Sequence, residues 1–235
     1  MRSKLQSKTR SDLKLLRARS FRPRKNQRYT EAFYMGAVSP SSQSIAAYIS
    51  QLAGANAKER ETAAYALFRL GCASAEPVLM KWFADPEFRA LIPRGRVLLT
   101  VGLAVHLPTF EAIRSRFGQP HVAEVPADQD VLEFELSFAH GVRLDVITPR
   151  TATGEGAIAK FLARFGEGIQ QVECDVCDVS RATEILQQRF QVQPIYPQIR
   201  AGANQTRVNF FLVPIADNRK LLIELVESPK KAKKP

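Results

Sequence analysis

The sequence predicts an α+β fold in which two βαβββ modules form one cleft, preceded by an N-terminal helical appendage. Two observations carry this prediction. From residue 97 onward, short apolar or alternating runs typical of strands are separated by amphipathic helical segments and turns. The same order of segments then occurs a second time in the chain. Two similar halves of this kind are expected to face each other across a shared hollow.

The internal repeat can be followed segment by segment. The first copy runs through VLLTVGLAV, the amphipathic segment LPTFEAIRSRFG and two alternating runs in VLEFELSFAHGVRLDVITP. The second copy runs through IQQVECDV, VSRATEILQQRF, TRVNFFLVP and LLIELVE. Residues 100–105 align with residues 171–176, and residues 144–146 align with residues 223–225. The paired βαβββ domain is therefore predicted to cover residues 95–228.

Residues 30–94 are predicted to form the helical appendage, because apolar residues recur there at helical spacing. Gly71 is expected to end one helix in a left-handed conformation, and Pro77 to lie in the first turn of the next. This helix pair, within residues 44–92, weakly resembles a HEAT-like repeat, with a plain three-helix appendage as the alternative. Because one repeat cannot bury its own apolar face, we expect the helices to pack on the β-rich domain or on a partner.

Positive charge is concentrated at the two ends of the chain. The 235 residues include 34 Lys and Arg against 23 Asp and Glu, a formal net charge of +11. Residues 1–28 hold eleven of these basic residues and one acid, and residues 229–235 hold four lysines. We therefore predict a disordered basic arm over residues 1–29 and a disordered basic tail over residues 229–235. Between them the chain holds more acidic than basic residues.

Three interpretations of the basic arm remain open. Residues 1–28 could bind nucleic acid or another polyanion, act as a mitochondrial presequence, or form a solvated tail without a specific partner. Three cysteines are too few for a disulfide framework, and no run approaches the roughly 20 apolar residues that span a bilayer. The sequence therefore predicts a cytoplasmic protein without a transmembrane segment, or a mitochondrial matrix protein if the arm is a presequence.

Residues 97–227 resemble the vicinal oxygen chelate (glyoxalase and bleomycin-resistance-like) superfamily and, within it, the methylmalonyl-CoA epimerase family. The phrases that carry the resemblance are AIAKFLARFGEGIQQVECDV between the modules, and IYPQIRAGANQTRVNFFLVP and LLIELVE near the end. The resemblance implies a divalent metal ion that stabilises the enolate of a thioester during proton transfer. It also implies an acyl-CoA-like or carboxylate ligand. A homodimer is a further expectation.

The resemblance implies four metal ligands, a His and a Gln from the first module and a His and a Glu from the second. These positions fall on Thr100, Asp145, Gln171 and Glu224, so both imidazoles are replaced and only the Glu is kept. Three outcomes remain open: a hydrogen-bonded polar cluster, a hard divalent ion held by oxygen ligands, and a metal-independent catalytic site. The acid that transfers protons falls near Asp128, so Glu224 and Asp128 are the predicted catalytic residues.

These observations predict a catalytically altered binder of a small acyl-CoA-like or carboxylate ligand. If the site is active, its chemistry is expected to be epimerase-, isomerase- or lyase-like. The alternative is a non-catalytic structural or adaptor protein that binds nucleic acid or a protein partner through its basic ends and helices. The three histidines, His106, His121 and His140, are not expected to reach the cleft.

Overall fold

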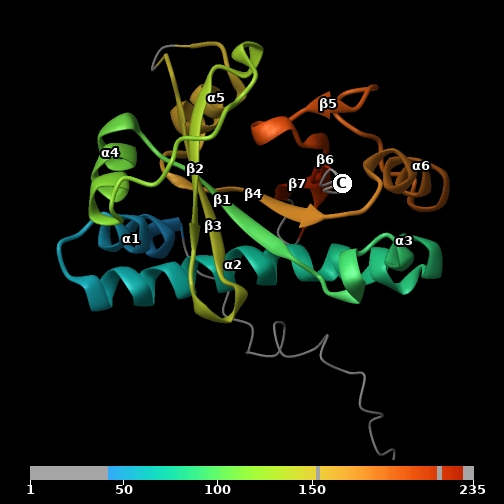
Figure 1. Cartoon of the computed structure of the whole chain (residues 1–235), viewed down its shortest axis with the longest axis horizontal. Helices are drawn as coiled ribbons and strands as arrows, with labels where there is room; N and C mark the ends of the chain where they lie inside the picture. The colour runs from blue at the N-terminus through green and yellow to red at the C-terminus, as the bar shows by residue number, and fades with distance from the viewer. Residues whose placement is uncertain (1–41, 152–153, 216–218, 230–235) are drawn as a thin grey trace, which may run out of the picture. The chain divides into compact units, whose positions relative to one another are not determined.

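The computed structural model describes residues 42–151, 154–215 and 219–229 (Figure 1). The first module contains β1 (Leu99–Ala104), α4 (Leu107–Arg116), β2 (Val131–Ser137) and β3 (Arg143–Pro149). The second contains β4 (Gly168–Asp175), α6 (Val179–Phe190), β5 (Arg200–Ala201), β6 (Arg207–Pro214) and β7 (Lys220–Glu227). The seven strands of the described residues form one curled sheet in the order β2-β3-β1-β4-β7-β6-β5. The modules meet where β1 and β4 pair antiparallel.

The predicted α+β fold with two similar modules is confirmed. In the first module β1 pairs in parallel with β3, and in the second β4 pairs in parallel with β7. The modules differ at their outer edges. In the first, an irregular segment bounded by Pro120 and Pro126 lies where the second has β5, and the Ala123 amide donates to the Glu133 carbonyl at 2.8 Å. Proline has no amide hydrogen for a strand ladder, which explains why this edge stays irregular.

Three helices, α1 (Ser42–Leu52), α2 (Ala57–Ala84) and α3 (Pro86–Ala90), precede the first module. Leu67, Leu79 and Trp82 of α2 share one buried core with Val101 of β1 and Val172 of β4. The helices therefore pack on the sheet, as expected (Figure 1). They cover its back face, while its concave face remains for a site.

The expected pair of helices divided between Gly71 and Pro77 is wrong, and with it the HEAT-like repeat. Both residues lie inside the continuous 28-residue helix α2. Gly71 serves close packing, because a Cβ there would lie 2.6 Å from a methyl carbon of Val101. Pro77 removes the amide that would bond to the carbonyl of Ala73, and both residues are exposed, so water can satisfy that carbonyl.

Helix α5 (Ala157–Phe165) connects the modules and packs on the concave side of the sheet. Its Ile158 and Leu162 form a small second core with Ala104 of β1 and Ile147 of β3. This core closes one end of the concave side. Within the described ranges, no helix is both long and apolar enough to cross a membrane.

Candidate functional site

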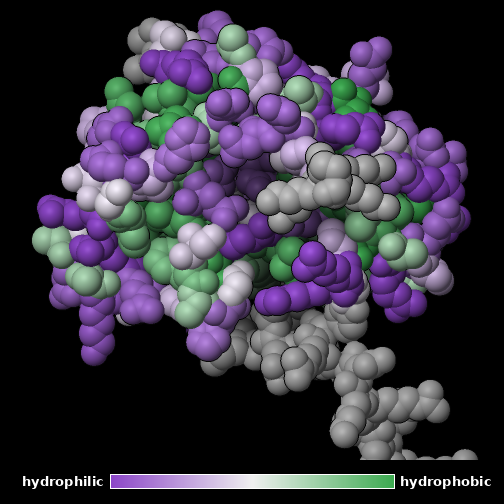
Figure 2. Space-filling model, viewed as in Figure 1, coloured by the Kyte–Doolittle hydropathy of each residue, from purple (hydrophilic) through white to green (hydrophobic). Residues whose placement is uncertain are grey.

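The concave face of the sheet lines a cavity of about 780 Å³ to which both modules contribute. Figure 2 shows a hollow surrounded by hydrophilic residues on this side of the molecule. Side chains on a strand alternate between the two faces, so every second residue of each strand points toward this space. The polar character of the cavity therefore comes from the alternate positions that do not contribute to the helix-covered core.

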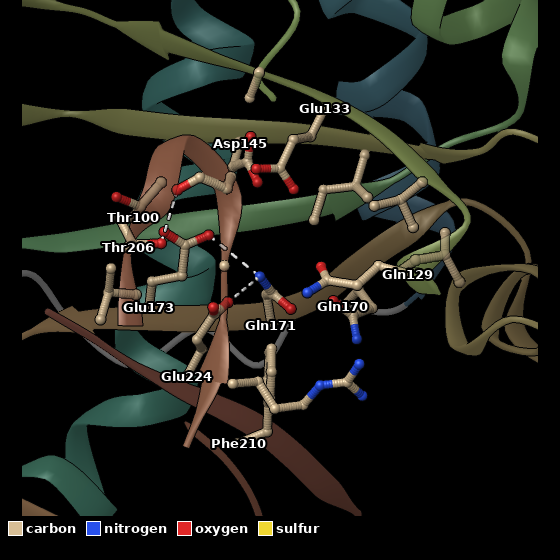
Figure 3. A pocket seen from close by; sticks show the side chains of 18 of the residues that line it. Thr100, Gln129, Glu133, Asp145, Gln170, Gln171, Glu173, Thr206, Phe210 and Glu224 are labelled. Carbon is tan, nitrogen blue, oxygen red and sulfur yellow. Dashed lines mark hydrogen bonds between the residues drawn. The ribbon is translucent and has the colours of Figure 1, made fainter. Parts of the chain in front are cut away.

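The four positions predicted as metal ligands lie together in this cavity. Thr100, Asp145, Gln171 and Glu224 are exposed by 1%, 8%, 6% and 8% of their surface and all line the cavity wall (Figure 3). Gly102 of β1 pairs with Asp145 on one side and with Gln171 on the other. A Cβ at Gly102 would lie 2.6 Å from the Gln171 Cγ, so the missing side chain makes room for this amide.

Of these four side chains, Gln171 and Glu224 form hydrogen bonds in the described structure. The Gln171 Nε2 donates to Glu224 Oε2 at 2.7 Å and to Glu173 Oε1 at 3.2 Å. The Gln171 amide therefore presents its N–H groups to the neighbouring carboxyls. The side chains of Thr100 and Asp145, in contrast, have no hydrogen-bond or ion-pair partner within the described part of the chain. A buried polar side chain without a partner is unfavourable unless a ligand or water completes it.

A β-bulge brings one further amide to the cavity. Gln171 pairs with Gly102, but the next pair along the strands joins Ile169 to Leu103, so Gln170 is the extra residue of β4. As a result, Gln170 and Gln171 both line the cavity, although they are adjacent in a strand (Figure 3). The Oε1 atom of Gln170 is buried and has no hydrogen-bond partner in the described structure.

Four acids of the cavity wall, Glu133, Asp145, Glu173 and Glu224, form what we call the carboxyl cluster. Burial raises the pKa of Glu133 and that of Glu173 to about 7. Burial, reinforced by repulsion from the neighbouring acids, raises the pKa of Asp145 and of Glu224 well above the ordinary value. At neutral pH the cluster therefore retains protons unless a positively charged group enters the cavity.

The basic side chains of the cavity wall offset the carboxyl cluster only in part, and of its members Arg143 acts on Glu173. Among the described residues, the Lys and Arg side chains that line the cavity are Arg143 and Arg200. Arg143 lies 3.3 Å from the Asp175 carboxylate, and Arg200 forms an ion pair with Asp128. Both guanidinium groups thus have a carboxylate partner outside the cluster.

Asp128, one of the two predicted catalytic residues, lies at the rim of the cavity. Its side chain is 64% exposed and is paired with Arg200, which stacks 4.5 Å from the centroid of the Tyr196 ring. His121 also lines the cavity, so the expectation that no histidine reaches it is wrong. Its side chain is exposed, which places it at the rim and leaves the buried wall without an imidazole in the described residues.

Loops of the two modules are joined at this rim by contacts that we call the interloop bridge. The Asn204 amide donates to the Glu124 carbonyl at 2.9 Å, and the Glu124 amide donates to Asn204 Oδ1 at 3.2 Å. The Gln129 Nε2 donates to the Ala201 carbonyl at 2.8 Å. These contacts join the first-module loop to the loop around β5, so the curled sheet is tied together at the cavity mouth.

The cavity wall does not fit the metal ion that the resemblance implies. Imidazole suits transition-type divalent ions, and none is present on the buried wall as described. Across residues 42–151, 154–215 and 219–229, no three His, Cys, Asp or Glu side chains are placed together to hold a metal ion. The Gln171 Nε2 also donates hydrogen bonds to Glu224 and Glu173, so one oxygen of each of these carboxyls already has a partner other than a metal ion.

A second pattern of the sequence, the C-x-x-C spacing of Cys174 and Cys177, contributes nothing to the cavity. Cys174 is buried and Cys177 is exposed, and neither forms a disulfide. Burial raises the pKa of the Cys174 thiol to about 12, which keeps it protonated and unreactive.

The fold and cavity define a class: an α+β protein whose two modules enclose one acid-lined cavity. No family model matches the chain, and no curated protein matches it. Among solved structures it is similar to the methylmalonyl-CoA epimerase from Mycobacterium tuberculosis, with 30% identity over 56% of this chain and 87% of that chain, and a TM-score of 0.47. Methylmalonyl-CoA epimerases are thus found among its structural neighbours, as the sequence resemblance predicted.

Two other solved structures show the range of similarity. A variant of the Streptomyces coelicolor methylmalonyl-CoA epimerase, in complex with 2-nitronate-propionyl-CoA, is 27% identical over 62% of this chain and 99% of that chain, with a TM-score of 0.47. A hypothetical protein from Bacillus halodurans C-125 is 20% identical over 59% of this chain and 99% of that chain, with a TM-score of 0.48.

The sequence prediction missed three polar residues of the cavity wall. Glu133 and Glu173 could have been found, because each alternates with apolar residues and so shares a face with other polar positions of its strand. Gln170 could not, because its orientation depends on the bulge, which has no signature in the local sequence.

Proposed function

We propose that this protein binds a small organic molecule in the cavity between its modules, and that its chemistry is altered from that of metal-dependent epimerases. The observation that supports this is the set of buried polar groups without partners, Thr100, Asp145 and Gln170, which face a common space of about 780 Å³. Leaving such groups unsatisfied costs about 1–3 kcal/mol each, whereas a ligand offsets this cost by completing their hydrogen bonds.

An acyl-CoA-like thioester is the candidate ligand that the sequence resemblance implies. One solved structure similar to this chain is a complex with 2-nitronate-propionyl-CoA. The carbonyl oxygen of a thioester accepts hydrogen bonds, and the raised pKa values of Asp145 and Glu224 favour protonated carboxyls that can donate them. A free carboxylate fits less well, because it would add negative charge beside the carboxyl cluster.

If the protein is an enzyme, the same carboxyls are the groups available for an epimerase-, isomerase- or lyase-like proton transfer. Glu224 is the candidate within the buried wall, since it lines the cavity and accepts a hydrogen bond from the Gln171 amide. A buried carboxylic acid that stays neutral can donate to an enolate oxygen, and a neighbouring carboxylate can take up the substrate proton. Asp128, at the rim and paired with Arg200, is the weaker candidate for this role.

Binding and turnover can be tested separately. We expect acyl-CoA thioesters such as propionyl-CoA and methylmalonyl-CoA to raise the melting temperature of the wild-type protein in a saturable way. Glu224→Gln should weaken the apparent affinity, obtained from the ligand concentration needed for this shift, about tenfold or more. Glu111→Gln, at an exposed position of α4 outside the cavity, should leave the affinity unchanged. Proton exchange at the acyl α-carbon, followed by NMR in deuterated water, then tests catalysis. Failure of every small molecule to stabilise the protein would exclude the proposed function.

The adaptor function is the alternative, and the concentrated charge of residues 1–28 favours it. Those residues and most of the tail lie outside the described ranges. Deleting residues 1–28 should abolish a salt-sensitive affinity for nucleic acid, measured by fluorescence anisotropy at several salt concentrations. Equal binding with and without the arm would exclude it as the contact. The predicted homodimer is tested in the same samples by sedimentation velocity.

A further inference from the structure

The polar atoms left free on the cavity wall are mainly hydrogen-bond acceptors. The side chains of Asp145, Glu133 and Thr100 have no hydrogen-bond partner in the part of the chain that is described, and the Gln170 Oε1 is buried without one. When a positively charged group displaces the proton of a carboxyl, the resulting carboxylate accepts hydrogen bonds only, and an amide oxygen does the same. The Gln171 amide, in contrast, already directs its N–H groups to Glu224 and Glu173. A group that only donates hydrogen bonds would complement such a wall.

The charge of the cavity wall also favours a ligand group that donates hydrogen bonds and is positively charged. The carboxyl cluster places four acids in one cavity, while the guanidinium groups there, among the described residues, are paired with Asp175 and Asp128. Asp145 is 8% exposed and its carboxyl interacts electrostatically with Glu133, Glu173 and Glu224 without an opposing cation among its interactions. Buried carboxylates at such a site are stabilised when a cation lies between them.

The distribution of the acids favours an organic cation over a metal ion. The four carboxyls come from β2, β3, β4 and β7, and neighbouring strands of a sheet lie about 4.8 Å apart. In the described structure they do not gather in threes around one point, as metal ligands do. Figure 3 shows instead that they are distributed along the wall, with the ring of Phe210 nearby. A molecule that is extended and partly apolar can reach several of them.

We propose that the ligand of this cavity carries protonated amine or guanidinium groups along its buried part, which face Asp145 and Glu224. The inference rests on the proposed function, because it assumes that a small molecule occupies the cavity, and it adds the charge class of that molecule. Thr100 and Gln170 supply neutral acceptors beside the carboxyls, and Phe210 offers an aromatic surface for the rest of the ligand. The wall would thus select positively charged ligands over neutral and anionic ones of the same size.

The test compares probes that differ in charge. Putrescine, agmatine and spermidine are titrated into the full-length protein by isothermal calorimetry, beside the uncharged butanediol of putrescine's length, propionyl-CoA, and magnesium, calcium or zinc chloride alone. At least one amine should bind saturably, and butanediol should bind at least tenfold more weakly. Asp145→Asn and Glu224→Gln should each weaken amine binding about ten- to hundredfold, because each removes one charge that faces the ammonium. Glu111→Gln should not change it.

Each outcome has a distinct meaning. Removing a buried acid relieves repulsion, so both cavity variants are expected to fold, which their melting temperatures check. Amine binding that is equal in all variants would assign it to the acidic surface in general and overturn the inference. Binding of propionyl-CoA or butanediol without the amines would overturn the inference and leave the proposed function standing, and variant-sensitive binding of a metal ion alone would overturn it in favour of a metal site. Binding of none of the probes overturns the inference, whereas the proposed function fails only if the wider set of thioesters also gives no stabilisation.

Discussion

The two faces of the sheet are built from the same strands but have opposite properties. In β7, Ile223 and Leu225 point toward the helices and are fully buried among apolar neighbours, whereas Glu224 between them faces the cavity. In β1, Val101 lies in the same apolar core and Thr100 lies in the cavity wall. The helix-covered face holds the fold together. The concave face buries acids beside one another at a cost in stability, which the proposed ligand would offset.

Truncating the helix-covered face should have the largest effect on stability. Trp82 of α2 is 2% exposed and packs against Phe88 and Phe211, with ring centroids 5.8 Å and 6.2 Å away. We expect Trp82→Ala to lower the free energy of unfolding by about 3–5 kcal/mol, because it leaves a cavity that the neighbours cannot fill. Urea denaturation measures the change. The control is Met80→Ala, since Met80 on the same helix is 51% exposed and should cost far less.

Adding volume at the contact between helix and sheet should have the next largest effect. A Cβ at Gly71 would lie 2.6 Å from two methyl carbons of Val101, which belongs to the centre of the sheet. Gly71→Ala should therefore destabilise the protein by about 1–3 kcal/mol, although alanine favours helices, because overpacking outweighs helix propensity here. Ala73→Ser, exposed on the same helix, is the matched control. A stabilised Gly71→Ala variant would show that α2 does not approach β1 this closely.

Neutralising the concave face should act in the opposite direction. The pKa values of Glu133 and Glu173 are about 7 in the folded protein, against 4.5 for an unperturbed Glu. The folded state therefore binds more protons than the unfolded state between these values, so the free energy of unfolding falls as the pH rises from about 4.5 through about 7.

Glu133→Gln and Glu173→Gln should each remove part of this pH dependence. Near pH 8 we expect each variant to be more stable than wild type by about 1–2 kcal/mol, with little difference near pH 4.5. Urea denaturation across this pH range provides the measurement. If both variants were less stable than wild type near pH 8, the carboxyls would be held as ions by an interaction that the described wall does not contain.

The same contrast explains what could be predicted from the sequence. Alternation of apolar and polar residues identified the strands, and the internal repeat placed Thr100 with Gln171 and Asp145 with Glu224 at equivalent positions. These signals are local or periodic. The continuity of α2 through Gly71 was not predictable, because the glycine is required by Val101, which lies far away in the sequence.

The cavity wall was predictable only where it follows strand periodicity. Glu133 keeps to the alternation of β2, but Gln170 breaks that of β4 through the bulge. Asp128 lies at the rim and forms an ion pair with Arg200 of the other module, a contact that the local sequence does not reveal. The charge state of the cavity acids could not be predicted from the sequence either, because it depends on which cations the fold brings near each acid.

The smallest effect is expected at the interloop bridge, which lies at the cavity mouth and joins loops of the two modules. Asn204 has a φ of +49°, and its Oδ1 accepts from the Glu124 amide at 3.2 Å. Asn204→Gly keeps the left-handed backbone accessible and removes this hydrogen bond, so we expect a loss of about 0.5–1 kcal/mol in global stability. The rate of amide hydrogen exchange should nevertheless increase at Glu124 and its neighbours, because the loop opens without global unfolding. Asn56→Gly at the N-cap of α2, which is not part of the cavity wall, should leave exchange at Glu124 unchanged. Unchanged exchange in Asn204→Gly would mean that the Glu124 amide is protected by the backbone of the first module alone.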